Sequence, residues 1–230
     1  MARGQNKADS GSQRGDQAGP RHAGHARQGE RASQGVIWDE RFAAMEWPAT
    51  PDQTLVELAG RIAPGRALDL GCGPGRNAIW LARQRWRVTG VDASPVGLAQ
   101  AEVRARQAGV SLELVNADVL SYVPPAGGFD LVVVANLHFS AEERQRFFER
   151  TVAAVAPGGH LYVVGHHLDS LRRAGPPVPE RLYTEPLLVR LLAPLDVEVR
   201  RHERPAEDGG GPLVDAVAWA TAPTGEGVAR

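Results

Sequence analysis

Short apolar runs alternate with helix-type spacings of apolar residues along the middle of the chain. Five runs of strand length predict β-strands at residues 66–70, 87–92, 111–118, 129–137 and 160–165. Apolar residues at helical periodicity predict helices at residues 77–84, 95–108 and 141–155. Strands that alternate with helices are typical of βαβ units, so we expect an α/β fold with a doubly wound, Rossmann-like and mostly parallel sheet.

Further elements flank this alternating region. Upstream, apolar residues at helical spacing predict helices over residues 36–47 and 53–62. Downstream, residues 184–193 predict a helix, and residues 196–204 and 212–222 alternate as strands joined by a polar turn. Two strands without a helix between them predict an antiparallel pair, which would complete a seven-stranded sheet at one edge.

The composition divides the chain into one domain and two tails. Residues 1–35 contain no Val, Ile, Leu, Phe, Tyr or Trp, so this stretch is predicted to be a disordered tail. We expect a single domain over residues 36–222, with residues 36–64 as a helical N-terminal segment, and a tail over residues 223–230.

Charge and cysteine content narrow the classes of partner. The formal net charge is −1, and no apolar run approaches the roughly 18 residues that span a bilayer, so neither nucleic acid nor a membrane is an expected partner. Cys72 is the one cysteine, which excludes an internal disulfide framework and fits a reducing cytoplasm. The basic residues are nearly all arginine, with Lys7 the one lysine, a bias that favours a GC-rich bacterial source.

A glycine-rich loop follows the first predicted strand of the alternating region, in the stretch A-L-D-L-G-C-G-P-G-R-N-A-I-W-L-A over residues 67–82. Gly71, Gly73 and Gly75 permit a tight turn before the next helix, which suits a ligand that approaches the backbone closely. Taken alone, residues 73–78 also satisfy the dinucleotide pattern G-x-G-x-x-A, so the loop by itself leaves the ligand open.

Three acidic residues at or near strand ends narrow the choice of ligand. Asp92 ends the second strand, where a carboxylate can accept both hydroxyls of a ribose. Asp118 ends the third strand, where it can accept from the exocyclic amine of an adenine. Asp69 precedes the glycine loop and can accept from a cationic amine, although a structural role there stays open. A ribose, an adenine and an ammonium group together point to S-adenosylmethionine (SAM) as the cofactor.

The motifs resemble those of a known family. A-L-D-L-G-C-G-P-G, V-D-A-S, N-A-D and F-D-L-V-V-V, in this order, resemble motifs I to IV of the class I SAM-dependent methyltransferases, over residues 65–165. The sequence G-C-G-P-G-R-N-A-I-W-L-A, with W-D-E-R-F upstream, resembles that of the small bacterial subgroup that includes tellurite-resistance-type and thiol methyltransferases.

The resemblance implies a set of residues around the methionine part of SAM. The three glycines would line it, and Asp69 would meet its amino group. Arg76 and Asn77 open the next helix and would reach its carboxylate, although Arg76 also suits a solvated helix start. Asn136, after the fourth strand, would border the same moiety.

The resemblance also implies contacts to the nucleoside and a cover. Asp92 would hold the ribose, and Asp118 with the backbone of Val119 would hold the adenine. Trp38 and Arg41 match a segment that in such enzymes folds over the cofactor as a lid, although Trp38 also has the spacing of a core residue.

Three histidines are candidates for proton transfer to or from the methyl acceptor. His138 follows the fourth predicted strand, and His166 and His167 follow the fifth, so all three fall where the acceptor is expected. Adjacent strand residues face opposite sides, so only one of the latter two is expected to face the pocket. Structural hydrogen bonding is the alternative role for each. Their spacing, without a nearby acid, predicts no metal site.

Further features of the sequence indicate the size and kind of the methyl acceptor. Residues 169–183 form a candidate cover over the acceptor, and Arg181 and Tyr183 in this cover would contact the acceptor. The N-P-P-Y motif is absent, and no large insertion is present to recognise a macromolecule. We therefore expect methyl transfer from SAM to an O, N or S atom of a small molecule. An NAD(P)-linked Rossmann oxidoreductase and a SAM-binding protein without transferase activity stay open as alternatives.

Overall fold

One seven-stranded sheet organises the protein. A computed structural model describes residues 35–206 and 209–225, so the predicted disordered tail lies outside the described residues, except for Gly35, as does most of the predicted C-terminal tail. The strand order is β3-β2-β1-β4-β5-β7-β6. The strands are β1 (Arg66–Leu70), β2 (Arg87–Asp92), β3 (Glu113–Asn116), β4 (Phe129–Ala135), β5 (Val155–His166), β6 (Asp196–Arg204) and β7 (Leu213–Thr221).

The strand directions confirm the predicted class. The strands β3, β2, β1, β4 and β5 are parallel to one another, and β7 runs antiparallel to both β5 and β6. The predicted bounds were wrong at the start of β5, which begins at Val155 rather than His160. The backbone of Val155 pairs with Phe129 across an irregularity in the β4–β5 ladder, and this pairing extends the strand through Pro157 and two glycines.

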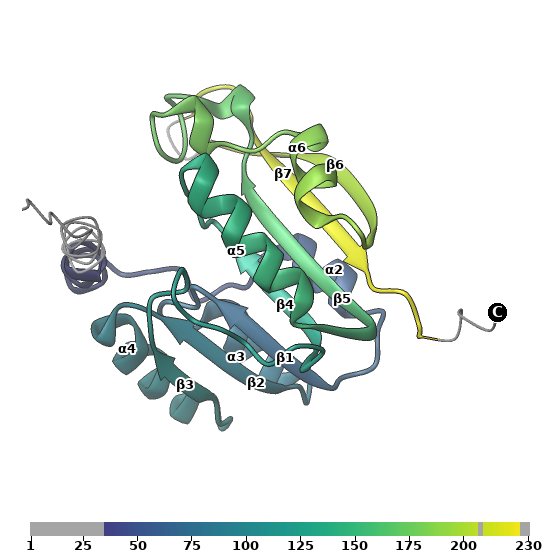
Figure 1. The fold of residues 1–230 in the computed structure, drawn as a ribbon. Helices are drawn as coiled ribbons and strands as arrows, with labels where there is room; N and C mark the ends of the chain where they lie inside the picture. Colours follow the sequence, from purple (N-terminus) through teal and green to yellow (C-terminus); the bar gives the residue numbers. More distant parts are fainter. Residues whose placement is uncertain (1–34, 207–208, 226–230) are drawn as a thin grey trace, which may run out of the picture.

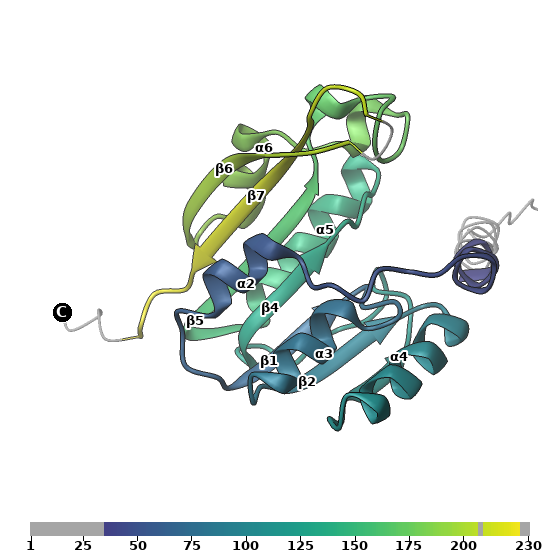
Figure 2. The ribbon, with the colours of Figure 1, turned by 180° about the vertical axis from the view of Figure 1, so that it is seen from behind.

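Helices cover both faces of the sheet (Figures 1 and 2). The helices α2 (Gln53–Ala59), α3 (Arg76–Arg83) and α4 (Pro95–Gln107) lie on one face, and α5 (Ala141–Ala153) and α6 (Glu185–Leu192) lie on the other. Each face has its own apolar core: Leu55 and Leu81 contribute to one, Phe147 and Leu188 to the other. No helix in the described part of the chain is long and apolar enough to cross a membrane.

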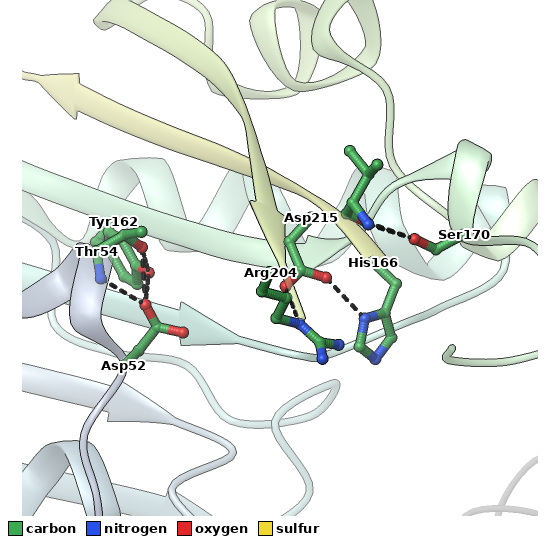
Figure 3. Close-up of polar contacts among 8 residues, drawn as sticks. Asp52, Thr54, Tyr162, His166, Ser170, Arg204 and Asp215 are labelled. Carbon is green, nitrogen blue, oxygen red and sulfur yellow. Dashed lines mark hydrogen bonds and ion pairs between the residues drawn. The ribbon is translucent and has the colours of Figure 1, made fainter. Parts of the chain in front are cut away.

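Side-chain caps set where several helices begin. Asp52 caps α2 by accepting from the backbone N–H of Thr54, and the hydroxyl of Tyr162 donates to the same carboxylate over 2.8 Å (Figure 3). This bond ties α2 to the middle of β5. Ser140 and Glu143 form a capping box at the start of α5. Side-chain hydrogen bonds thus fix the first residues of α2 and α5.

The connection between β3 and β4 contains no helix. Residues 117–128 make turns, in which Asp118 Oδ1 accepts from the backbone N–H of Leu120 over 2.8 Å. The chain turns to opposite sides at β1 and β4, which are neighbours in the sheet, so their carboxyl ends flank the topological switch point where ligands bind in such folds.

Candidate cofactor and acceptor site

The glycine loop follows β1 at the switch point. Gly71 and Gly73 have φ angles of 74° and 49°, in the left-handed region that favours glycine. A Cβ on Gly71 would lie 2.6 Å from the Leu137 side chain, and one on Gly73 would lie 3.0 Å from the ring of Phe42. The loop is thus held between the segment that follows β4 and the N-terminal segment, at the place where we expect the cofactor.

Asp69 supplies the strongest electrostatic feature of the site. Its side chain is 2% exposed, and its Oδ2 has no hydrogen-bond partner among the described residues. Burial raises the pKa of Asp69 to about 7, although the charge of Arg76 lowers it in part. A buried carboxylate oxygen without a partner is costly, and a cationic amine would stabilise it. The residue therefore fits the ammonium group of SAM.

Asp92 joins two loops of the site. Its Oδ2 accepts from the backbone N–H of Gly73 and its Oδ1 from that of Ser94, each over 2.8 Å. Burial raises the pKa of Asp92, and these two hydrogen bonds act in the opposite direction. Asp92 therefore has a structural role, because it caps backbone N–H groups at the end of β2. Each carboxylate oxygen can accept a further bond, so the predicted ribose contact is compatible with it.

The ends of β2 and β3 are also linked. Asn116 Nδ2 donates to the backbone oxygens of Asp92 and Ala93, each over 3.1 Å. Asp118 lies two residues after Asn116, and Val119, a buried residue, follows Asp118. The residues predicted to contact ribose and adenine are therefore brought together at adjacent strand ends.

The N-terminal segment, residues 35–47, packs against the glycine loop. Residues 35–44 are helical, and Phe42 is buried against Trp38 and Trp47, with ring centroids 5.5 and 5.0 Å away. Arg41 lies over the Trp38 ring, 4.9 Å from its centroid. Asp39 accepts from Ser94 at the start of α4 and fastens the segment there. The segment therefore contacts the glycine loop through Phe42, and its role as a lid stays a prediction.

Asn77 has a structural partner. The side chain is buried, and its Oδ1 accepts from the backbone N–H of Asp52 over 2.9 Å, which connects α3 to the cap of α2. This leaves the amide nitrogen as the group able to reach a cofactor carboxylate. The structural role could not be predicted, because it depends on a residue 25 positions upstream.

The side chains of two of the three predicted histidines lie in contact near the carboxyl ends of β4 and β5. The rings of His138 and His166 are stacked, with centroids 5.1 Å apart and planes 8° apart. The Nδ1 of His138 lies 3.0 Å from the backbone oxygen of Arg181, while its Nε2 is buried without a hydrogen-bond partner in the described residues. Burial lowers the pKa of His138 to about 4, so the ring is neutral at pH 7.

His167 is separated from this pair. Its Nε2 lies 2.9 Å from Glu185, and its Nδ1 accepts from the backbone N–H of Asp169 over 3.0 Å. Adjacent residues 166 and 167 thus have different partners. No cluster of three His, Cys, Asp or Glu side chains within residues 35–206 and 209–225 could hold a metal ion.

The predicted acceptor residues differ in exposure. Tyr183 is fully buried, and its hydroxyl donates to the backbone oxygen of Leu137 over 2.7 Å. This hydrogen bond fixes the backbone next to His138. Arg181 is partly exposed and contacts His138 through its backbone. The sequence did not predict Asp215, which is hydrogen-bonded to His166, or Arg204, which donates a hydrogen bond to Asp215. The one signal was an acid within an otherwise apolar strand.

Comparisons with known proteins agree with this arrangement. Residues 67–159 match the family model described as "Methyltransferase domain". The chain is 37% identical over 117 residues to trans-aconitate 2-methyltransferase from Sinorhizobium medicae, covering 49% of this chain and 43% of that protein. It is 32% identical over 108 residues to ribosomal RNA small subunit methyltransferase C from Alcanivorax borkumensis, covering 45% and 33%. The chain thus spans less than half the length of these curated relatives.

Solved structures share the fold. TehB from Haemophilus influenzae superposes with a TM-score of 0.64 at 18% identity, covering 80% of this chain and 67% of that chain. The N-methyltransferase NodS from Bradyrhizobium japonicum, in complex with S-adenosyl-L-homocysteine (SAH), gives 0.57 at 20% identity, covering 85% and 87%.

The sheet order, the glycine loop at the switch point and the family match together define a class I methyltransferase fold. Residues 67–159 thus match a methyltransferase domain, and the sheet has the fold of the class I SAM-dependent methyltransferases, as the motifs predicted.

Proposed function

We propose that this protein transfers a methyl group from SAM to an O, N or S atom of a small molecule. The observation that carries the proposal is the unpartnered, buried carboxylate of Asp69 beside the glycine loop. A dinucleotide would bring an anionic pyrophosphate to this loop, where Asp69 would repel it. The ammonium group of SAM would pair with Asp69 instead, which favours SAM over NAD(P).

Different residues would bind the different parts of SAM. Asp69 would hold the amino group and Asp92 the ribose, while Asp118 and the Val119 backbone would hold the adenine. Trp38 and Arg41 belong to the N-terminal segment, which would exclude water from the site. SAM, when bound, supplies a methyl group on a sulfonium, which is a good leaving group, so orientation and desolvation provide much of the rate enhancement.

A small acceptor is supported by the size of the fold. Residues 169–183, between β5 and α6, would cover the methyl acceptor, and the described residues contain no inserted domain beyond this segment. Arg181 lies in this cover. Trans-aconitate 2-methyltransferase is similar to this chain, as is an enzyme named for ribosomal RNA, so transfer to RNA is the alternative to be tested. We also propose a bacterial cytoplasmic location, which the arginine bias and the single cysteine support.

Calorimetry and a labelled-SAM assay test the proposal. We expect SAH to bind the purified chain and NAD⁺ not to bind. Binding of NAD⁺ without SAH would show that an oxidoreductase is the better assignment. Radiolabelled SAM offered with thiols, phenols, amines and ribosomal RNA then separates the acceptors. SAH binding without transfer to any of them would favour a SAM-binding protein without transferase activity.

A further inference from the structure

Three adjacent strands bring together an arginine, an aspartate and a histidine on the acceptor side. Arg204 Nε of β6 donates to Asp215 Oδ2 of β7 over 2.6 Å, and His166 Nδ1 of β5 lies 2.9 Å from Asp215 Oδ1 (Figure 3). His166 and Asp215 are direct partners across the antiparallel β5–β7 ladder. The register of the last strand therefore places the carboxylate behind the imidazole.

The protonation of this array follows from its partners. Asp215 is buried; burial acts to raise its pKa, but the hydrogen bonds from His166 and Arg204 outweigh it and lower the pKa below its ordinary value. An ionised carboxylate only accepts hydrogen bonds, so the proton of a neutral His166 lies on Nδ1. Its Nε2 then carries a lone pair on the ring edge that faces away from Asp215.

His166 lies where an acceptor would bind. It ends β5, stacks on His138 after β4, and its side chain is 17% exposed. Gly175 of the cover lies against the same ring, since a Cβ there would come within 2.4 Å of it. The backbone of residues 169–183 therefore packs against the imidazole.

The other two histidines are less suited to take a proton. His138, with its pKa lowered by burial to about 4, would hold a proton poorly at neutral pH. Both ring nitrogens of His167 are engaged, by Glu185 and by the backbone of Asp169. Only His166 combines a carboxylate that would stabilise the imidazolium with a ring nitrogen left for a substrate, among the histidines of the described site.

We infer that His166 is the proton acceptor of the reaction, that Asp215 and Arg204 are its positioning residues, and that the methyl acceptor is a hydroxyl compound of phenol type. The inference rests on the proposed methyltransferase function. A phenol, with a pKa of about 10, needs a base at neutral pH, whereas a thiol of lower pKa ionises more readily.

The proposed step balances in atoms and charge. The hydroxyl proton passes to His166 Nε2, and the oxygen forms a bond to the methyl carbon. The bond between that carbon and the sulfonium sulfur breaks, and its electron pair stays on sulfur. The products are the methyl ether, SAH and a proton on His166, which Asp215 stabilises until it is released to solvent.

The experiment compares two acceptors that differ in their need for a base. Catechol-type phenols and thiophenol are offered with labelled SAM to the wild type, His166→Gln and Asp215→Asn. His160→Gln, six residues before His166 in β5, is the matched control. For the phenols we expect kcat/KM to fall about a hundredfold in His166→Gln and at least about tenfold in Asp215→Asn. Thiophenol transfer and SAH affinity should change less than about threefold in both.

The pH profile separates a positioning role from a structural one. The charged or titratable groups next to His166 among the described residues are His138, Asp215 and, through Asp215, Arg204; His202 is the partner of Asp215 in the β6–β7 ladder. Asp215 accepts a hydrogen bond from His166 Nδ1, so loss of its charge should move the acidic limb of the phenol profile in Asp215→Asn and leave the thiophenol profile in place. A structural effect would lower the rate without moving that limb.

Each outcome decides the inference. Equal losses for phenols and thiophenol, an unmoved limb, or SAH binding without transfer to any phenol would overturn it and leave the cofactor assignment intact. Failure of the wild type to bind SAH would instead contradict the proposed function. If Asp215→Asn does not fold, His166→Gln with nitrogen NMR of the wild-type ring decides: a proton found on Nε2 rather than Nδ1 at neutral pH overturns the inference.

Discussion

The backbone N–H of Gly73 donates a 2.8 Å hydrogen bond to Asp92 Oδ2, and this bond joins the glycine loop to the end of β2. The other carboxylate oxygen of Asp92 accepts from Ser94 at the start of α4. One side chain thus holds the shape of two loops that we expect to surround the cofactor. Its removal should disturb both folding and binding.

Asp92→Ala tests this double role. We expect SAH affinity to fall at least about tenfold and the free energy of unfolding to fall by about 1–3 kcal/mol, because two buried N–H groups lose their acceptor. Calorimetry and urea unfolding measure the two effects. Glu102→Ala, on the exposed face of α4, is the control and should change neither. Unchanged SAH affinity in Asp92→Ala would contradict the ribose assignment.

The buried carboxyl of Asp69 should couple cofactor binding to pH. Since burial raises its pKa to about 7, the carboxyl is partly protonated at neutral pH and must lose its proton to pair with an ammonium group. We expect SAH affinity to fall as the pH falls below about 7, by up to about tenfold per pH unit. Calorimetry in buffers of different ionisation enthalpy counts the released proton. Asp69→Asn should bind weakly at every pH, and a flat wild-type profile would contradict the assignment.

The same carboxyl should lower the stability of the ligand-free protein at high pH. Its pKa in the folded state lies above the ordinary value of 3.8, so the folded state binds the proton more tightly, and the free energy of unfolding falls as pH rises from about 4 to about 7. Asp69→Asn lacks this dependence. Relative to the wild type it should gain on the order of 2–4 kcal/mol between these pH values. Urea unfolding at both pH values measures the gain, which a purely steric effect would not produce.

Phe42 should connect the N-terminal segment to the cofactor site. Its ring packs against Gly73 and between two tryptophans, so Phe42→Ala is expected to cost about 3 kcal/mol of stability and to weaken SAH binding. Met45→Ala is the control, because Met45 is 58% exposed. Titrations with SAH report the affinity, and thermal unfolding reports the stability. Full SAH affinity in Phe42→Ala would show that the segment is no lid.

The elements that sequence predicted well are those set by local patterns. The alternation of apolar strands and helices predicted the sheet, and the polar turn before β7 predicted the antiparallel pair. The start of β5 was mispredicted, because Pro157 and the two glycines after it are typical of a turn, while the pairing of Val155 with Phe129 depends on the neighbouring strand.

The candidate site shows the same division. Asp69, Asp92 and Asp118 follow strands or lie at their ends, so parallel topology alone predicted that they would gather at one edge of the sheet. The partnership of His166 with Asp215 could not be predicted, because it depends on the register between two strands whose paired side chains are 49 residues apart.

The position of β7 has a consequence for how the chain folds during synthesis. β7 is the last strand to be translated, yet it lies between β5 and β6. Until residues 213–221 leave the ribosome, β6 has no neighbour in this sheet, and the edge of β5 stays open. A nascent chain that stops before Leu213 would therefore carry the complete glycine loop, while the edges of β5 and β6 that pair with β7 stay unpaired. Unpaired strand edges of this kind favour aggregation and binding by chaperones.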